Sequence, residues 1–241
     1  MRPVTITPRY GLICLPTLLA IAMSQPHDSR NLFLSGPVGR LEAILWTPHS
    51  SIPPPLAALV GHPHPLFGGT MHNKVVYQAA KSIDALGIPV LRFNFRGAGL
   101  SAGVHDLGHG EQDDVCAALQ FLSSEFPKVP LLLAGFSFGS VVVLRVGCKV
   151  PEASNLIALG IPVNNADVSF LSECRKPKLF VHGSDDEHGA LRKVEALVPS
   201  LPGENRLVII QGVDHFFTGK LGELDHAITG WLRERVPGLK K

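Results

Sequence analysis

Short apolar runs alternate with stretches of helical spacing along most of this sequence. Apolar runs that end in turn residues are typical of buried strands, and apolar residues three or four positions apart are typical of helices that pack on one face. The predicted strands are residues 56–60, 89–95, 130–134, 155–161, 178–182 and 206–211. The predicted helices are residues 73–86, 110–126, 141–148, 190–198 and 219–236. Strands separated by helices predict an α/β fold, with a mostly parallel central sheet and helices on both faces.

An antiparallel hairpin is expected to lead this sheet. Residues 31–47 alternate between apolar and polar positions, and Ser35, Gly36 and Pro37 form a turn cluster between the two halves. We therefore assign residues 31–241 to a single α/β domain, because this length suits one substantial core.

Residues 1–30 are expected to lie outside the domain, as an N-terminal extension or a signal-like segment. Residues 11–23 are apolar and follow two arginines, and residues 20–22 read Ala-Ile-Ala, which is typical of a signal-peptide cleavage site. The stretch is too short to span a bilayer as a helix, so we expect no stable membrane association. Two interpretations stay open: a signal peptide, or an upstream extension before a translation start at Met23.

Composition excludes some classes of function. The net charge is +2 and the basic residues are scattered, so the sequence has no basic stripe for nucleic acid. The four cysteines lie far apart and form no C-x-x-C pair, so we expect reduced thiols instead of a disulfide framework or a zinc site. They are Cys14, Cys116, Cys148 and Cys174. Because disulfides usually accompany export, we expect a cytoplasmic protein.

Residues 135–139 read Gly-Phe-Ser-Phe-Gly and lie between a predicted strand and a predicted helix. A serine is a poor nucleophile unless its Oγ is held beside a base, with amide donors nearby for the developing oxyanion. A tight strand-to-helix turn meets these conditions, and it needs both glycines because a Cβ at either position would collide with the strand and helix. The motif predicts a nucleophile elbow with Ser137 at its tip. The alternative is a glycine-rich turn with a capping serine.

Two further strand ends carry groups that could activate this serine. Functional groups in open α/β sheets gather beyond the carboxyl ends of the strands. His215 follows the last predicted strand and is the candidate base, since the pKa of imidazole lies near working pH. Asp185 and Asp186 follow the preceding strand, where a carboxylate would fix the histidine tautomer. We favour Asp186, with Asp185 as the alternative, and interpret Asp214 as a turn residue.

The loop after strand 56–60 is expected to supply one of two donors to an oxyanion hole. Pro63 and Pro65 in this loop have no N–H group to donate. The donor is therefore the amide of His64, or else that of Leu66, acting together with the amide of Phe138.

No metal ion or nucleotide cofactor is expected. An H-x-H pair could begin a metal site, but no carboxylate or cysteine completes a recognisable ligand spacing. The histidines concerned are His62 and His64, with His72, His105 and His109 not far along the chain. The glycine-rich stretch 96–103 lacks the full G-x-G-x-x-G motif and is not followed directly by a helix. We interpret it as a rim loop in which Arg96 and Asp106 are structural ion-pair members.

Together these motifs resemble the α/β-hydrolase superfamily, from about Asn31 to the C-terminus. The matching segments are 62–65, 93–97, 135–139, 182–186 and 214–215. The sequence is most similar to compact, lid-poor bacterial hydrolases that are distantly similar to dienelactone hydrolases and small carboxylesterases. The resemblance implies Ser137 as nucleophile, Asp186 as acid and His215 as base, with an oxyanion hole formed by the amides of Phe138 and His64.

The sequence departs from this family at two positions. Dienelactone hydrolases proper use cysteine where this chain has Ser137, so their substrate does not carry over. Pro63 stands where many relatives have glycine. Only about sixteen residues separate strand 155–161 from strand 178–182, where a cap domain usually enters this fold, so we expect a small lid or none.

The sequence thus predicts a serine hydrolase that cleaves a small carboxylic ester or thioester through an acyl-enzyme intermediate. Its expected partner is a small-molecule ester, and the sequence does not indicate an oligomeric state. A peptidase or amidase on the same triad is one alternative, and a catalytically silent hydrolase fold that serves as a binding protein is another. Five phenylalanines could line an apolar acyl pocket or belong to the core: Phe136, Phe138, Phe170, Phe216 and Phe217.

Overall fold

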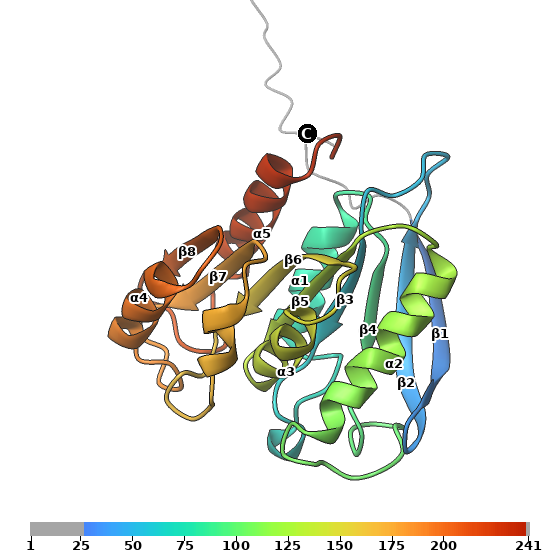
Figure 1. The fold of residues 1–241 in the computed structure, drawn as a ribbon, viewed down its shortest axis with the longest axis horizontal. Helices are drawn as coiled ribbons and strands as arrows, with labels where there is room; N and C mark the ends of the chain where they lie inside the picture. The colour runs from blue at the N-terminus through green and yellow to red at the C-terminus, as the bar shows by residue number, and fades with distance from the viewer. Residues whose placement is uncertain (1–26, 240–241) are drawn as a thin grey trace, which may run out of the picture.

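The central feature of the structure is an eight-stranded sheet of order β1-β2-β4-β3-β5-β6-β7-β8 (Figure 1). The computed structural model describes residues 27–239. The strands are β1 (His27–Gly36), β2 (Gly39–Pro48), β3 (Ala57–Gly61), β4 (Val90–Phe93), β5 (Leu131–Phe136), β6 (Ala153–Leu159), β7 (Lys178–Gly183) and β8 (Asn205–Ile210). Pairs β1–β2 and β2–β4 are antiparallel, and every other pair is parallel. The predicted mostly parallel sheet with an antiparallel start is confirmed.

The leading hairpin is longer than the sequence pattern indicates. β1 begins at His27, four residues before the predicted start at Asn31, and Gly36 pairs with Gly39 across a two-residue turn. The additional residues are polar and mostly exposed at the sheet edge. Backbone pairing therefore extends the strand where no apolar alternation marks it. Residues 1–26, on which a signal peptide or an upstream extension was predicted, lie outside the described residues.

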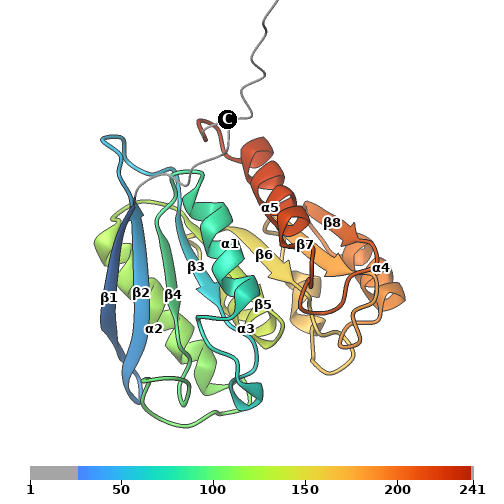
Figure 2. The ribbon, with the colours of Figure 1, turned by 180° about the vertical axis from the view of Figure 1, so that it is seen from behind.

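Helices cover both faces of the sheet. Those on one face are α1 (Lys74–Asp84) and α5 (Leu221–Arg235), and those on the other are α2 (Gly110–Glu125), α3 (Phe138–Gly147) and α4 (Leu191–Ser200) (Figures 1 and 2). Two short 3₁₀ helices, η1 (Pro65–Phe67) and η2 (Ser169–Glu173), were not predicted. Every residue of β3 and β5 is buried, as the continuous apolar runs of a doubly covered sheet require. Among residues 27–239, no helix has the length and apolar character needed to cross a bilayer.

α3 forms although Val141, Val142 and Val143 are poor helix formers. All three side chains are buried and belong to the core cluster on this face of the sheet. Helix propensity disfavours a valine by less than about 0.7 kcal/mol relative to alanine. Full burial of a valine side chain contributes about 1.5–3 kcal/mol, so packing decides the conformation of this segment.

A disulfide links Cys148, after the end of α3, to Cys174, after the end of η2. The Cα atoms lie 5.3 Å apart, so the expectation of reduced thiols is wrong for this pair. Cys116 is free and exposed, and Cys14 lies outside the described residues. Closing a loop of 26 positions stabilises the fold by about 3 kcal/mol if the bond acts by constraining the unfolded chain. The cytoplasmic expectation assumed that the protein has no disulfide, so it loses that support.

Candidate active site

Ser137 occupies a strained backbone position between β5 and α3. Its φ of 54° and ψ of −124° are unusual for a residue with a Cβ, and such strain is typical of catalytic turns. A Cβ at Gly135 would lie 2.4 Å from the carbonyl oxygen of Gly139, and one at Gly139 would lie 2.4 Å from that of His62. Both contacts are with backbone atoms that cannot move aside. The structure therefore confirms that the turn needs a glycine on each side of Ser137.

His215 and Asp186 form a buried hydrogen-bonded pair at the carboxyl ends of β8 and β7. The Nδ1 of His215 lies 2.8 Å from Oδ2 of Asp186. Oδ1 of the same carboxylate accepts from the amides of His188 and Gly189, at 2.8 and 3.0 Å. Burial acts to raise the pKa of Asp186, but the hydrogen bond and charge of His215 outweigh it, so the pKa is lowered. The ionised carboxylate fixes the proton on Nδ1 and leaves Nε2 of His215 free to accept one.

Asp185 and Asp214 have different partners. Asp185 is exposed and its Oδ1 accepts from the hydroxyl of Ser184 at 2.8 Å. Asp214 accepts from both the amide and the hydroxyl of Thr218, which confirms it as a turn residue. Of the two carboxylates left open by the sequence, the structure brings Asp186 to His215 and holds Asp185 in the loop.

The loop after β3 leaves the amide of His64 as its candidate oxyanion donor. The ring Nδ1 of His64 accepts from the amide of Leu66 at 3.3 Å, so that amide is already used. The amide of Phe138 lies in the first turn of α3, where no helical carbonyl precedes it to act as acceptor. Both residues line the same cavity as Ser137, and their rings lie 4.9 Å apart between centroids.

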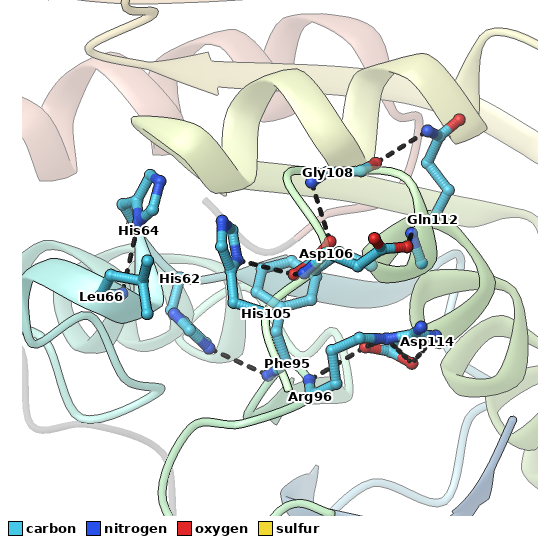
Figure 3. A network of polar contacts seen from close by, with 12 residues as sticks. His62, His64, Leu66, Phe95, Arg96, His105, Asp106, Gly108, Gln112 and Asp114 are labelled. Carbon is cyan, nitrogen blue, oxygen red and sulfur yellow. Dashed lines mark hydrogen bonds and ion pairs between the residues drawn. The ribbon is translucent and has the colours of Figure 1, made fainter. Parts of the chain in front are cut away.

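His62 holds this loop in place by hydrogen bonds to the backbone on two segments. Its Nε2 accepts from the amide of Phe95 at 2.9 Å (Figure 3), and its Nδ1 donates to the carbonyl of Pro63 at 2.6 Å. Burial lowers its pKa to about 4, against a smaller opposing effect of the Pro63 hydrogen bond. Because both ring nitrogens bind backbone groups, His62 offers no free ligand to the H-x-H metal site that the sequence left as an alternative. No group of three or more candidate ligands for a metal ion lies together within residues 27–239.

The stability of the protein is expected to fall as the pH drops from about 6.5 towards 4. His62 has a lower pKa folded than unfolded, so its contribution is complete above 6.5 and is lost as the pH falls through about 4. Linkage gives a loss of roughly 3 kcal/mol over this interval. Urea unfolding across this range should show a shallower pH dependence for His62→Gln than for the wild type. The matched variant His226→Gln, at an exposed position of α5, should keep the wild-type slope.

A second buried polar cluster lies beside the His64 ring, and the sequence pattern does not reveal it. Nδ1 of His105, which Figure 3 labels, lies 2.7 Å from Oε1 of Glu111 at the start of α2, and both side chains are buried. Glu111 also accepts from the amides of Asp106 and Gly108. The rings of His64 and His105 lie 4.5 Å apart between centroids. Glu111 is visible in the sequence only as part of an acidic first turn, which favours the helix dipole and does not reveal this contact.

Arg96 is an ion-pair member as predicted, but its partner is Asp114. Nη2 of Arg96 lies 2.7 Å from Oδ1 of Asp114, and the backbone amide of Arg96 donates to Oδ2 at 2.9 Å. The expectation for Asp106 is wrong, because its carboxylate accepts from the amide of Gly110 and so caps α2. A side chain on Gly110 would collide with the Arg96 guanidinium, so the cap and the ion pair are packed tightly together.

Two further histidines lie beside the His215–Asp186 pair. His182 is fully buried at the end of β7, and its Nε2 donates to the carbonyl of Gly189 at 2.6 Å. This bond closes the loop that carries Asp186. The ring of His188 packs edge-on against that of His215, with centroids 4.5 Å apart. His182 begins segment 182–186, one of the segments that resemble the family, whereas no sequence signal distinguishes His188 from the other histidines of the chain.

A cavity of about 840 Å³ opens over these residues, and Ser137 and His215 line it together with His64 and Phe138. Its size is within the range of small-molecule sites. Of the five phenylalanines predicted for an acyl pocket, Phe138 and Phe216 line the cavity. Phe136 and Phe217 are instead fully buried in the core. Phe170 packs beneath the guanidinium of Arg145 and is not part of the wall.

The comparisons with known proteins agree with this architecture. The α/β-hydrolase domain family matches residues 67–223. An uncharacterised protein from Rickettsia prowazekii (strain Madrid E) is 39% identical over 213 residues, covering 83% of this chain and 87% of that protein. The chain belongs to the α/β-hydrolase family. This α/β hydrolase is also similar to a serine hydrolase without a lid from Xanthomonas campestris, with 38% identity and a TM-score of 0.82 over 89% of this chain and 98% of that one. An α/β serine hydrolase homologue from Coxiella burnetii is 36% identical, with a TM-score of 0.80 over 84% of this chain and 97% of that one.

The expected absence of a large lid agrees with the shape of this α/β hydrolase. Residues 160–177, between β6 and β7, contain η2 and no cap domain. The cavity above Ser137 is bordered by loops, which include η1 after β3, the segment before α2 and the turn after β8.

Proposed function

We propose that this α/β hydrolase cleaves small carboxylic esters or thioesters through an acyl-enzyme intermediate. The observation that carries the proposal is the buried hydrogen bond between His215 and Asp186, on strand ends that open into the same cavity as the strained Ser137. In the proposed roles Ser137 is the nucleophile, His215 the base and Asp186 the acid that orients it.

The first half of the reaction acylates the enzyme. Oγ of Ser137 attacks the ester carbonyl while Nε2 of His215 takes the hydroxyl proton, and Asp186 stabilises the resulting imidazolium. The negative charge that develops on the carbonyl oxygen is received by the amides of His64 and Phe138. The tetrahedral intermediate then collapses, and the imidazolium gives its proton to the departing alcohol or thiol.

The second half repeats these steps with water as the nucleophile. Nε2 of His215 takes a proton from water, which attacks the acyl-enzyme carbonyl, and the same two amides receive the oxyanion. Collapse breaks the bond to Oγ of Ser137, which regains its proton from His215. The products are a carboxylic acid and the free enzyme, and no cofactor takes part in these steps.

Labelling with a fluorophosphonate probe tests the proposal before any substrate is known. The wild type should bind the probe covalently and release p-nitrophenol from p-nitrophenyl butyrate, whereas Ser137→Ala and His215→Ala should do neither at a detectable rate. His226→Ala, which changes an exposed histidine of α5 that does not line the cavity, should be labelled like the wild type. A folded wild type that takes up no probe would reject the proposal and favour a binding protein with a silent hydrolase fold.

A further inference from the structure

One face of α3 forms a continuous wall of the cavity that begins at Ser137. The residues on this wall are spaced three or four apart, as one side of a helix requires. On α3 they are Phe138, Val141, Val142 and Arg145, and Lys149 extends the wall from the turn that follows the end of α3 at Gly147. The wall is therefore apolar beside Ser137 and cationic at its far end.

The charge of the cavity is unbalanced at that far end. Among the residues that line the cavity, Arg145 and Lys149 are the cationic side chains with a permanent charge, and Asp167 is the one carboxylate. Asp167 already accepts from Arg145, at 3.2 Å from Nη2, and from the amide of Ser169. Lys149 is exposed and forms no ion pair with any residue of the described chain. One positive charge is thus left without a protein partner.

The separation between this charge and the reacting serine can be estimated from the helix. Arg145 lies eight positions and Lys149 twelve positions after Ser137, and a helix rises about 1.5 Å per residue, so their Cα atoms lie about 12 Å and about 18 Å from that of Ser137 along the axis. The Arg145 guanidinium is held by Asp167 and packs over the ring of Phe170, so Lys149 is the cation that remains open to a ligand. The apolar stretch of the wall between Ser137 and these cationic side chains suits a chain of methylene groups.

We propose that the preferred substrates are esters or thioesters that carry an anionic group about 12–18 Å from the scissile carbonyl. This inference rests on the proposed function and specifies its substrate class. Lys149 would bind the anion, while Val141 and Val142 contact the apolar chain that joins it to the ester. The anion can belong to the acyl group or to the leaving group, because either could extend along α3 from the carbonyl.

Two pairs of matched substrates distinguish an anion on the acyl group from an anion on the leaving group. In the first pair, mono-p-nitrophenyl dodecanedioate carries a free carboxylate on the acyl chain, and its distal methyl ester is the neutral control. In the second, acetyl-coenzyme A carries phosphates on the leaving group, and S-acetylpantetheine lacks them. The wild type should show a kcat/KM about tenfold higher for the charged member of one pair, and added salt should reduce this preference.

A charge-reversal variant tests whether the preference comes from this end of the cavity. Lys149→Glu should lower the ratio of kcat/KM for the charged and neutral members of that pair by about fivefold or more. The control is Lys193→Glu, which makes the same change in net charge at an exposed position of α4 and should leave the ratio unchanged.

The outcomes distinguish this inference from the proposed function. Uptake of the fluorophosphonate without preference for a charged substrate in either pair would overturn the inference and leave the serine hydrolase standing. The inference is likewise overturned if Lys149→Glu and Lys193→Glu alter the ratio equally, since the preference would then reflect net charge alone. Failure of the wild type both to take up the probe and to hydrolyse any of the four substrates would overturn the inference and the proposed function together.

Discussion

Replacing Asp186 by asparagine is expected to lower kcat for ester hydrolysis by about 10³- to 10⁴-fold with little change in KM. The carboxylate of Asp186 accepts from Nδ1 of His215 at 2.8 Å, and its lowered pKa keeps it ionised at neutral pH. An amide at this position can turn its NH₂ group towards Nδ1 and hold the proton on Nε2 instead. The imidazole then could not take the proton of Ser137, and no negative charge would stabilise the imidazolium.

The neighbouring aspartate provides a matched control for this substitution. Asp185→Asn changes the same functional group one position earlier, where the carboxylate is exposed and accepts from Ser184. Steady-state kinetics with p-nitrophenyl butyrate should show kcat for Asp185→Asn within about twofold of the wild type. If Asp185→Asn were the slower variant, or if Asp186→Asn kept full activity, the assignment of Asp186 would have to be abandoned.

Most of the fold could be predicted because the strands of this sheet are buried on both faces. β3 and β5 appear in the sequence as short, wholly apolar runs, and the helices between them carry one apolar face. The edge hairpin is less visible, since β1 is mostly exposed and gains its first residues from backbone pairing with β2. The α/β-hydrolase fold therefore follows from the pattern, whereas the ends of its edge strands do not.

Local sequence context could also place candidates for the triad. Ser137 lies in a pentapeptide with two glycines, and a Cβ at either glycine would lie 2.4 Å from a backbone oxygen. His215 and Asp186 follow strands whose carboxyl ends share one edge of the sheet, so topology alone brings them near each other. The choice between Asp186 and Asp185 needed coordinates, because adjacent residues of a loop point in different directions.

Contacts between distant segments could not be derived in this way. Cys148 and Cys174 lie 26 positions apart and meet because the segment after η2 returns to the end of α3. His105 is one of eleven histidines in the sequence, and its contact with Glu111 depends on how the loop before α2 folds back. Arg96 is closer in sequence to Asp106 than to Asp114, yet helix α2 presents Asp114 to it. In each case the partner is selected by packing and not by spacing.

Removal of the Asp114 carboxylate is expected to cause a large loss of stability. Asp114 is fully buried and accepts three close hydrogen bonds from the Arg96 side chain, from Nε at 3.1 and 3.0 Å and from Nη2 at 2.7 Å. The hydrogen bonds to Asp114 raise the pKa of Arg96, which therefore stays charged. Asp114→Ala would leave this cation and the Arg96 amide buried without a partner, at a cost of about 3–5 kcal/mol in the free energy of unfolding.

Urea unfolding followed by circular dichroism measures this loss, and Asp113→Ala is the matched control. Asp113 is the exposed neighbour in α2, so it shares the favourable charge of the helix N-terminus but not the contact with Arg96. Its removal should change the free energy of unfolding by no more than about 0.5 kcal/mol. Equal losses in the two variants would mean that Asp114 acts through the helix dipole. A selective loss in Asp114→Ala would instead show that the ion pair anchors the loop between β4 and α2, which carries His105 to the ring of His64.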